Sequence, residues 1–320
     1  MAKPYFIYPR QRITRYKRPS DNVNLTPQDP MPGKLETYLI DTIRNKPLKK
    51  FFKGKQGRKV LSKALPEDVI AVTVQTVDHK IMVDPRDLVG RSVLLHGSWG
   101  RGGTNRVVEY LTRIGKLRGH GVALNLGANI GCQALYLKLT NQFSKVIAVE
   151  AAPQNFEFLR SNVHLNDWAA EITPVHAAVY TEDGTIELHL KEDDVSGGHS
   201  LLNLPGNTRS IEVTALTVGS IARREDINFE DVEFVWMDIE GFDFDILQDI
   251  NKTFGSRLPV FFEFSPRFIG EEKAREFIAY LRENYTHILD FKGSGTDPSP
   301  VADFDALAKT PQQDLLVYGD

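Results

Sequence analysis

Short apolar runs alternate along the last two hundred residues with segments whose apolar positions recur every three or four residues. The short apolar runs predict strands that are buried on both faces. The segments with apolar positions every three or four residues predict helices, because side chains repeat every 3.6 residues along a helix. The predicted strands cover 122–126, 145–149, 173–179, 233–237, 260–264, 285–289 and 314–318. The alternation predicts an α/β fold with a mostly parallel, seven-stranded sheet and helices on both of its faces.

Two helices of this region show a clear apolar face. The first begins near Pro153, a residue favoured in the first helical turn, and carries Phe156, Leu159 and Val163 on one side. The second lies around residues 274–281 and has the same spacing. Both helices therefore have the pattern expected of helices that cover a sheet.

The chain before this region predicts an N-terminal extension. Its elements are a helix that Pro47 ends, two strands joined by a short polar turn and a second helix, over 34–46, 70–74, 80–83 and 107–114. We therefore divide the chain into an arm at 1–33, an extension at 34–118 and a main domain at 119–320.

Charge is distributed unevenly along the chain. The first sixty residues contain 15 Lys and Arg against 4 Asp and Glu, and the remaining residues contain 24 against 38. The arm, residues 1–33, is rich in proline and predicts a flexible segment in which Tyr and Arg alternate. Such an arm suits nucleic acid, an anionic membrane or an acidic partner. We favour a solvated tail or an arm that joins copies in a homo-oligomer.

The composition narrows the class of protein. Hydrophobic residues make up 41% of the chain and charged residues 25%, as in ordinary globular domains. We find neither an apolar run that could span a bilayer nor a secretory signal. Cys132 is the single cysteine, so no intrachain disulfide can form, and we expect a cytoplasmic protein.

A glycine turn at Gly127–Gly131 follows the first predicted strand of the main domain and precedes a helix. Glycines allow close backbone approach, and the free N–H groups of a helix start favour an anionic ligand. Glu150 ends the next strand, where a carboxylate can accept hydrogen bonds from ribose hydroxyls. A dinucleotide loop needs glycine at the positions of Asn129 and Cys132. The turn therefore predicts a nucleoside-containing cofactor other than NAD or a flavin.

Two acids, Asp238 and Glu240, follow the strand at 233–237. In open α/β sheets ligands bind beyond the carboxyl ends of strands where the order reverses, here between the first and fourth strands. Asp238 should therefore lie across a crevice from Gly127. The alternative is that these acids cap the helix predicted at 242–250. For Glu240 we give capping and a role at the ligand site equal weight, and for Asp238 we favour the ligand site.

The segments at 84–91, 124–131, 148–156, 237–241 and 262–266 together resemble those of FkbM-type S-adenosylmethionine (SAM)-dependent methyltransferases in order and spacing. This resemblance covers roughly residues 80–320. It implies a Rossmann-like class I methyltransferase fold, SAM as cofactor and S-adenosylhomocysteine as product. It also implies O-methylation of a hydroxyl on a small molecule, such as a sugar or secondary metabolite, or on a glycan.

The resemblance and the strand positions together assign the cofactor site to Asn125, Gly127, Ala128, Asn129, Glu150, Ala151, Ala178 and Asp238. Asn125 departs from the family, which usually has Asp there to help hold the methionine ammonium. A second departure lies at Trp99-Gly100, because the family often carries an acid near that pair.

Methylation of a hydroxyl needs a general base or a metal, because the hydroxyl pKa lies far above neutral. Asp238 is the base best placed by the strand order, and Glu240, His199 and Glu263 are further candidates, with His199 in a glycine-rich loop. Acids at the fourth strand end leave a Mg²⁺ requirement open, and no His/Cys cluster indicates zinc.

Two other functions stay open. A nucleic-acid methyltransferase could use the basic arm, but the chain has Asp238–Gly241 in place of the Asn/Asp-Pro-Pro-aromatic motif that acts on base amines. A non-catalytic SAM-binding scaffold is the second alternative, and Asn125 is the observation in its favour.

Overall fold

The computed structural model describes residues 50–51, 54–66, 68–191, 199–202, 207–291 and 297–320. Residues 52–320 form one compact unit. The predicted arm at 1–33 and the predicted helix at 34–46 lie outside the described residues.

An eight-stranded sheet forms the centre of the unit, in the order β12-β11-β13-β10-β9-β3-β4-β5. Its strands are β3 (Gly121–Leu126), β4 (Phe143–Glu150), β5 (Ile172–His176), β9 (Val232–Met237), β10 (Val260–Phe264), β11 (His287–Asp290), β12 (Ser299–Pro300) and β13 (Gln313–Tyr318). The five strands from β10 to β5 are parallel, and β13 is antiparallel to β10 and β11. The predicted fold class is confirmed, and the two-residue β12 adds an eighth strand to the predicted seven.

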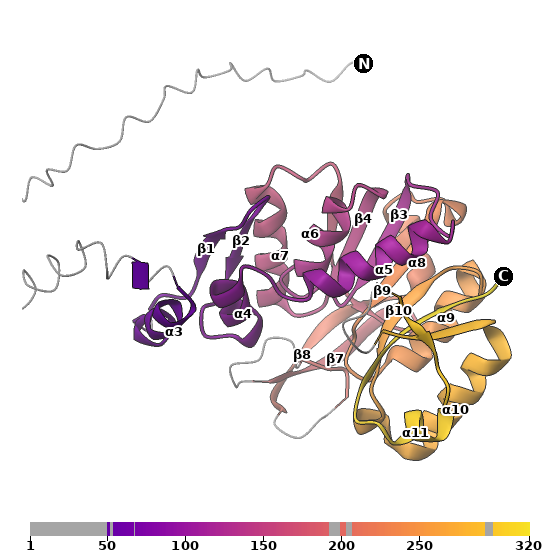
Figure 1. Ribbon diagram of the computed structural model, residues 1–320. Helices are drawn as coiled ribbons and strands as arrows, with labels where there is room; N and C mark the ends of the chain where they lie inside the picture. Colours follow the sequence, from indigo (N-terminus) through magenta and orange to yellow (C-terminus); the bar gives the residue numbers. More distant parts are fainter. Residues whose placement is uncertain (1–49, 52–53, 67, 192–198, 203–206, 292–296) are drawn as a thin grey trace, which may run out of the picture. The chain divides into compact units, whose positions relative to one another are not determined.

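Helices cover both faces of the sheet (Figure 1). One face packs against α8 (Val218–Arg224), α9 (Asp243–Phe254), α10 (Pro266–Asn284) and α11 (Phe304–Lys309). The other packs against α4 (Leu88–His96), α5 (Arg101–Arg113), α6 (Cys132–Leu139) and α7 (Pro153–Leu165). Leu124 and Leu126 of β3 face the first group and Ala123 faces the second, so the strand is buried on both sides.

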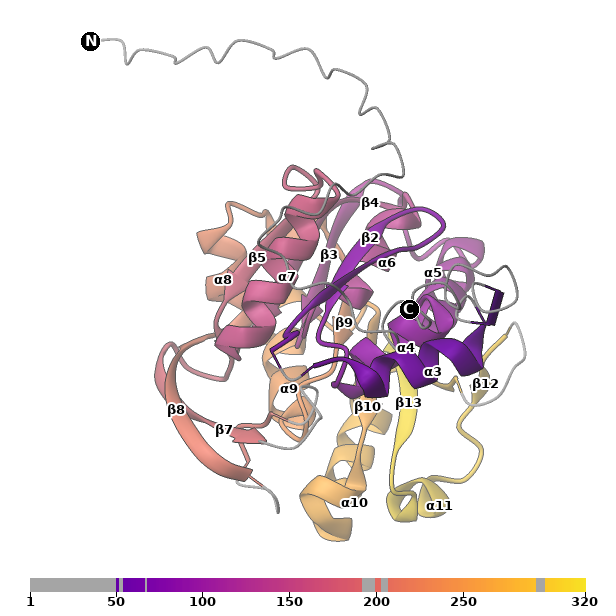
Figure 2. The same cartoon turned by 90° about the vertical axis from the view of Figure 1, so that its left-hand side faces the viewer.

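A second sheet departs from the prediction. The predicted strand 173–179 ends at His176, and Ala178–Val179 forms β6, which pairs with a different sheet. That sheet contains the long hairpin of β7 (Gly184–Lys191) and β8 (Asn207–Leu216) (Figure 2). The alternating side chains of β7 give the period-2 signal of a strand, which our prediction did not include.

The N-terminal part of the unit contains α3 (Lys55–Ala64), β1 (Val72–Gln75) and β2 (Lys80–Val83), and the short 3₁₀ helix η2 (Phe229–Asp231) precedes β9. The predicted strand 80–83 coincides with β2, and α5 covers most of the predicted helix 107–114. The helix α3 was not predicted, because its sequence is rich in charged residues and shows few apolar positions. No helix among the described residues has the length and apolar content needed to cross a membrane.

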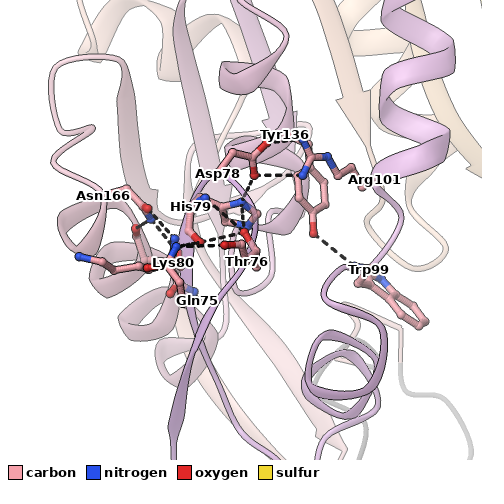
Figure 3. A network of polar contacts seen from close by, with 10 residues as sticks. Gln75, Thr76, Asp78, His79, Lys80, Trp99, Arg101, Tyr136 and Asn166 are labelled. Atoms are coloured by element: carbon pink, nitrogen blue, oxygen red, sulfur yellow. Dashed lines mark hydrogen bonds and ion pairs between the residues drawn. The ribbon is translucent and has the colours of Figure 1, made fainter. Parts of the chain in front are cut away.

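Side-chain hydrogen bonds fix the β1–β2 hairpin to the main domain (Figure 3). The Asn166 amide donates to the Lys80 carbonyl at 2.7 Å and accepts from its N–H at 2.8 Å. Asp78, in the hairpin turn, pairs with Arg101 of α5, with 3.0 Å between Nη1 and Oδ1. The hydrogen bond from Arg101 lowers the pKa of Asp78 to about 2. The start of α5 is therefore tied to the hairpin.

Candidate functional site

A cavity of about 420 Å³ lies at the carboxyl ends of β3, β4 and β9. Among the residues predicted for the site, it is lined by Gly127, Asn129, Glu150, Ala151, Ala178, His199, Asp238, Glu240 and Glu263. Two others, Asn125 and Ala128, are buried and do not line it. The structure thus brings together side chains that are more than a hundred residues apart in the sequence.

The glycine turn lies against the end of β9. Gly127 has a left-handed φ of +76°, and its N–H donates to the Val149 carbonyl at 3.0 Å. A Cβ on Gly127 would stand 1.8 Å from the Asp238 backbone oxygen, closer than any side chain can approach. The Asp238 N–H also donates to the Leu126 carbonyl at 2.9 Å. Only glycine therefore lets these two strand ends meet.

Glu150 stands at the end of β4 with 7% of its surface exposed. Its Oε2 accepts the Asn129 N–H at 2.7 Å, and its Oε1 accepts the Ala152 N–H at 2.8 Å. Burial raises the pKa of this carboxyl, and the backbone N–H groups partly oppose the shift. An ionised carboxylate has about four lone-pair sites, so Glu150 can still accept hydrogen bonds from a ligand.

Asn125 lies under the cavity wall with 1% of its surface exposed. Its side-chain oxygen and nitrogen have no hydrogen-bond partner among the described residues. A buried amide without partners costs free energy, on the order of 1–3 kcal/mol. Asn125, predicted for the cofactor site, does not line the cavity.

Acidic residues gather at the ends of β9 and β10. The Asp238 side chain is exposed where it lines the cavity. The protein packed around it, together with Glu263 and Glu240, raises its pKa well above the usual value. Burial, and then Glu263, raises the pKa of Glu240 to about 7. Glu240 also has a left-handed φ of +51°, a strained conformation for a residue other than glycine.

Neither Asp238 nor Glu240 caps α9, because that helix begins after Phe242 without a side-chain cap. Asp243, in the first turn of α9, instead accepts the Gly241 N–H at 3.2 Å. Helix capping therefore does not explain the two acids. Their place at the cavity is the remaining explanation.

The cavity also contains residues that the sequence prediction missed. Leu88, Val89 and Trp99 come from the N-terminal extension, and Leu188, Ser200 and Leu201 come from the hairpin region. The Ser200 hydroxyl donates to the Glu240 carbonyl at 2.7 Å, which ties the hairpin region to the strained segment. Arg267 stands 3.5 Å from Glu263, which also accepts a hydrogen bond from Gln312. Trp99 and the segment at 84–91, which contains Leu88 and Val89, had a sequence signal, but neither was assigned to the site.

Comparison with known proteins bears on these residues. The family model of the methyltransferase FkbM domain matches residues 125–291. The match includes the glycine turn, Glu150 and both acids after β9, and it covers more than half of the chain. The chain belongs to the FkbM methyltransferase family. The predicted family and its SAM-dependent class are thereby confirmed.

Solved structures similar to this FkbM chain include the M. jannaschii tRNA m1G37 methyltransferase, with 11% identity and a TM-score of 0.38. That match covers 80% of this chain and 59% of the other. M. jannaschii TYW2 in complex with AdoMet has 12% identity and a TM-score of 0.40. That match covers 79% of this chain and 86% of the other. An O-methyltransferase from Bacillus cereus in complex with SAH has 10% identity and a TM-score of 0.37. That match covers 68% of this chain and 80% of the other. TM-scores at this level support no argument about the chain. No curated protein matches it significantly.

His199 is less suited to act as a base of the FkbM domain than Asp238 or Glu240. Its Nδ1 faces the Lys191 N–H at 3.2 Å, and burial lowers the pKa of the imidazole. A neutral ring that accepts at Nδ1 carries its proton on Nε2. His199 therefore offers a hydrogen-bond donor through Nε2. Among the described residues we find no group of three His, Cys, Asp or Glu side chains placed to hold a metal.

The raised pKa of Glu240 predicts a pH-dependent stability. The folded protein holds this proton up to about pH 7, whereas the unfolded chain releases it near 4.5, so stability is lost as pH rises between these values. Glu240→Gln should remove that loss. One pKa unit is about 1.4 kcal/mol, so we expect the variant to gain about 2 kcal/mol over wild type between pH 5 and pH 8.

Urea unfolding at both pH values measures this gain. Glu276→Gln, which neutralises an exposed carboxylate on α10, is the matched control and should show no such trend. An equal effect of Glu240→Gln at pH 5 and pH 8 would contradict the assigned pKa.

Proposed function

We propose that this protein binds SAM in the cavity and transfers its methyl group to a hydroxyl of a small-molecule or glycan acceptor, leaving S-adenosylhomocysteine. The observation that carries the proposal is the meeting of three features at one cavity. These are the Gly127 turn, the Glu150 carboxylate at the end of β4 and the acids Asp238 and Glu240 after β9.

The residues present fit this cofactor. Glu150 is held by the backbone of Asn129 and Ala152, so its remaining lone pairs have a fixed direction for ribose hydroxyls. The turn at Gly127 has no side chain, which leaves its backbone open to close approach. Ala151 and Ala178 contribute small side chains to the wall and leave room for a flat ring.

The acids after β9 fit the chemistry. When bound, SAM supplies an activated methyl group on a positively charged sulfonium. A positive charge beside Asp238 favours its ionised form, which the neighbouring acids otherwise oppose. Asp238 can then take the proton of the acceptor hydroxyl as the new bond forms, and Glu240, with its pKa of about 7, is the alternative base.

Transfer of a labelled methyl group tests the proposal. The full chain is incubated with methyl-labelled SAM and an extract of its source organism, and the labelled products are identified by mass. We expect label on an oxygen of a small molecule or glycan. Label on RNA or DNA would replace the proposed acceptor class, and SAM binding without transfer to any fraction would indicate a non-catalytic protein.

A further inference from the structure

A second cavity, of about 880 Å³, lies beside the first and between α3 and α4. The two helices pack together, and the Arg58 guanidinium donates to the Leu94 carbonyl at 3.1 Å (Figures 1 and 2). Leu88 and Trp99 line both cavities. The second cavity therefore shares part of its wall with the first cavity, which we call the methyl-donor cavity because we place SAM there.

The polar lining of this second cavity is cationic. It contains Lys59, Lys63, Arg86, Arg91 and His96, and we call this set the basic groove. Ser62 and Ser92 add hydroxyls, and no carboxylate is among the described lining residues. The methyl-donor cavity, by contrast, is lined by four acids and one arginine: Glu150, Asp238, Glu240, Glu263 and Arg267. The two cavities therefore have opposite charge.

Among the described residues, partners within the protein engage the two arginines of the basic groove but not its two lysines. Asp84 contacts Arg86 at 3.3 Å, and Arg91 donates to the Arg86 carbonyl. Lys59 and Lys63, one helical turn apart on α3, are exposed and have no ion-pair partner among the described residues. An anion from outside the chain suits this groove.

Trp99 separates the basic groove from the methyl-donor cavity. Its backbone N–H donates to the Tyr136 hydroxyl at 3.2 Å, and the Arg101 guanidinium lies 5.7 Å from the Tyr136 ring centroid (Figure 3). Arg101 is in turn paired with Asp78. The backbone at Trp99 is thus held in place, and its indole, which lines both cavities, offers an apolar face to a ligand that reaches from one to the other.

We propose that the basic groove binds the phosphate group of the methyl acceptor, whose hydroxyl-bearing ring passes Trp99 to reach the methyl-donor cavity. The proposal rests on the proposed function and narrows the acceptor to a phosphorylated hydroxyl compound, such as a sugar phosphate. Lysine and arginine recognise phosphate through charge-assisted hydrogen bonds. The opposite charge of the two cavities orients such an acceptor, because the acids repel its phosphate.

Calorimetry on the full chain tests this, with glucose 6-phosphate, UDP-glucose and glucose as probes in the presence of S-adenosylhomocysteine. We expect one or both phosphorylated probes to bind and glucose to bind at least tenfold more weakly. A preference between the two distinguishes a phosphomonoester from a nucleotide-linked diphosphate. Equal binding of glucose, or binding of no phosphorylated probe, would overturn the proposal.

The double variant Lys59→Gln/Lys63→Gln locates the phosphate. An exposed ion pair contributes about 0.2–1 kcal/mol, so losing two should weaken phosphate binding roughly 2- to 30-fold at low salt. The matched control, Lys252→Gln/Lys309→Gln, neutralises two exposed lysines elsewhere and should change nothing. Unchanged affinity of the groove variant would overturn the proposal.

SAM affinity, measured in the same proteins, separates the two claims. If the wild-type protein does not bind SAM, the proposed function is refuted. If it binds SAM but no phosphorylated probe, only the phosphate site in the basic groove is refuted.

Discussion

Replacing Glu150 by alanine is expected to weaken SAM binding by about 10- to 150-fold, because a hydrogen bond to a charged group contributes about 1.5–3 kcal/mol. Glu150 is the only acid at the end of β4 that lines the described cavity, and its position is fixed by the Asn129 and Ala152 N–H groups. Calorimetric titration with SAM measures the change.

The same variant removes two structural hydrogen bonds, so thermal unfolding must show that it stays folded. Glu150→Gln keeps the shape and one acceptor, and we expect an intermediate loss from it. Glu157→Ala, on the exposed side of α7, is the matched control. Normal SAM affinity in folded Glu150→Ala would show that the acid only supports the loop.

Asp238→Asn is expected to lower methyl transfer by about 100- to 10,000-fold, the usual contribution of a general base. The amide is nearly the same shape but cannot take the acceptor proton. Stability should not fall, because the change removes a charge that Glu263 and Glu240 oppose. Single-turnover transfer and SAM titration on the same protein measure the two effects.

The pattern of losses identifies the role of Asp238. Lost transfer with retained SAM affinity indicates the base, and loss of both indicates a partner for the methionine ammonium. If EDTA treatment of wild type reproduces the defect, Asp238 is a metal ligand. Asp245→Asn on α9 is the control for removing an acid outside the cavity. Normal affinity with normal transfer in Asp238→Asn would exclude all three roles.

Much of the site follows from the sequence, because strand order fixes which strand ends meet. Strand 260–264 was predicted to the residue, since its apolar run ends sharply at both sides. The closeness of Gly127 and Asp238 follows from pairing of β3 with β9, in which Leu126 lies opposite Met237. A chain turn after each strand then places the two residues together.

Other features depend on packing that local sequence does not encode. The approach of Leu88 and Trp99 to the cavity requires the extension to dock onto the main domain, which it does through Asn162 and Asn166. The break at Ala177 was missed because no Gly, Asn or Asp marks a turn within residues 173–179, although they pair in two different sheets. The basic groove likewise needs α3 and α4 side by side, which neither helix indicates by itself.

Calorimetric titration of the full chain with SAM, S-adenosylhomocysteine and NAD tests the central claim most directly. The turn from Gly127 to Gly131 lacks the glycines of a dinucleotide loop, and Glu150 suits a single ribose. We predict one site that binds SAM and S-adenosylhomocysteine and no heat change with NAD. Binding of NAD together with no response to SAM would contradict the assignment of this cavity.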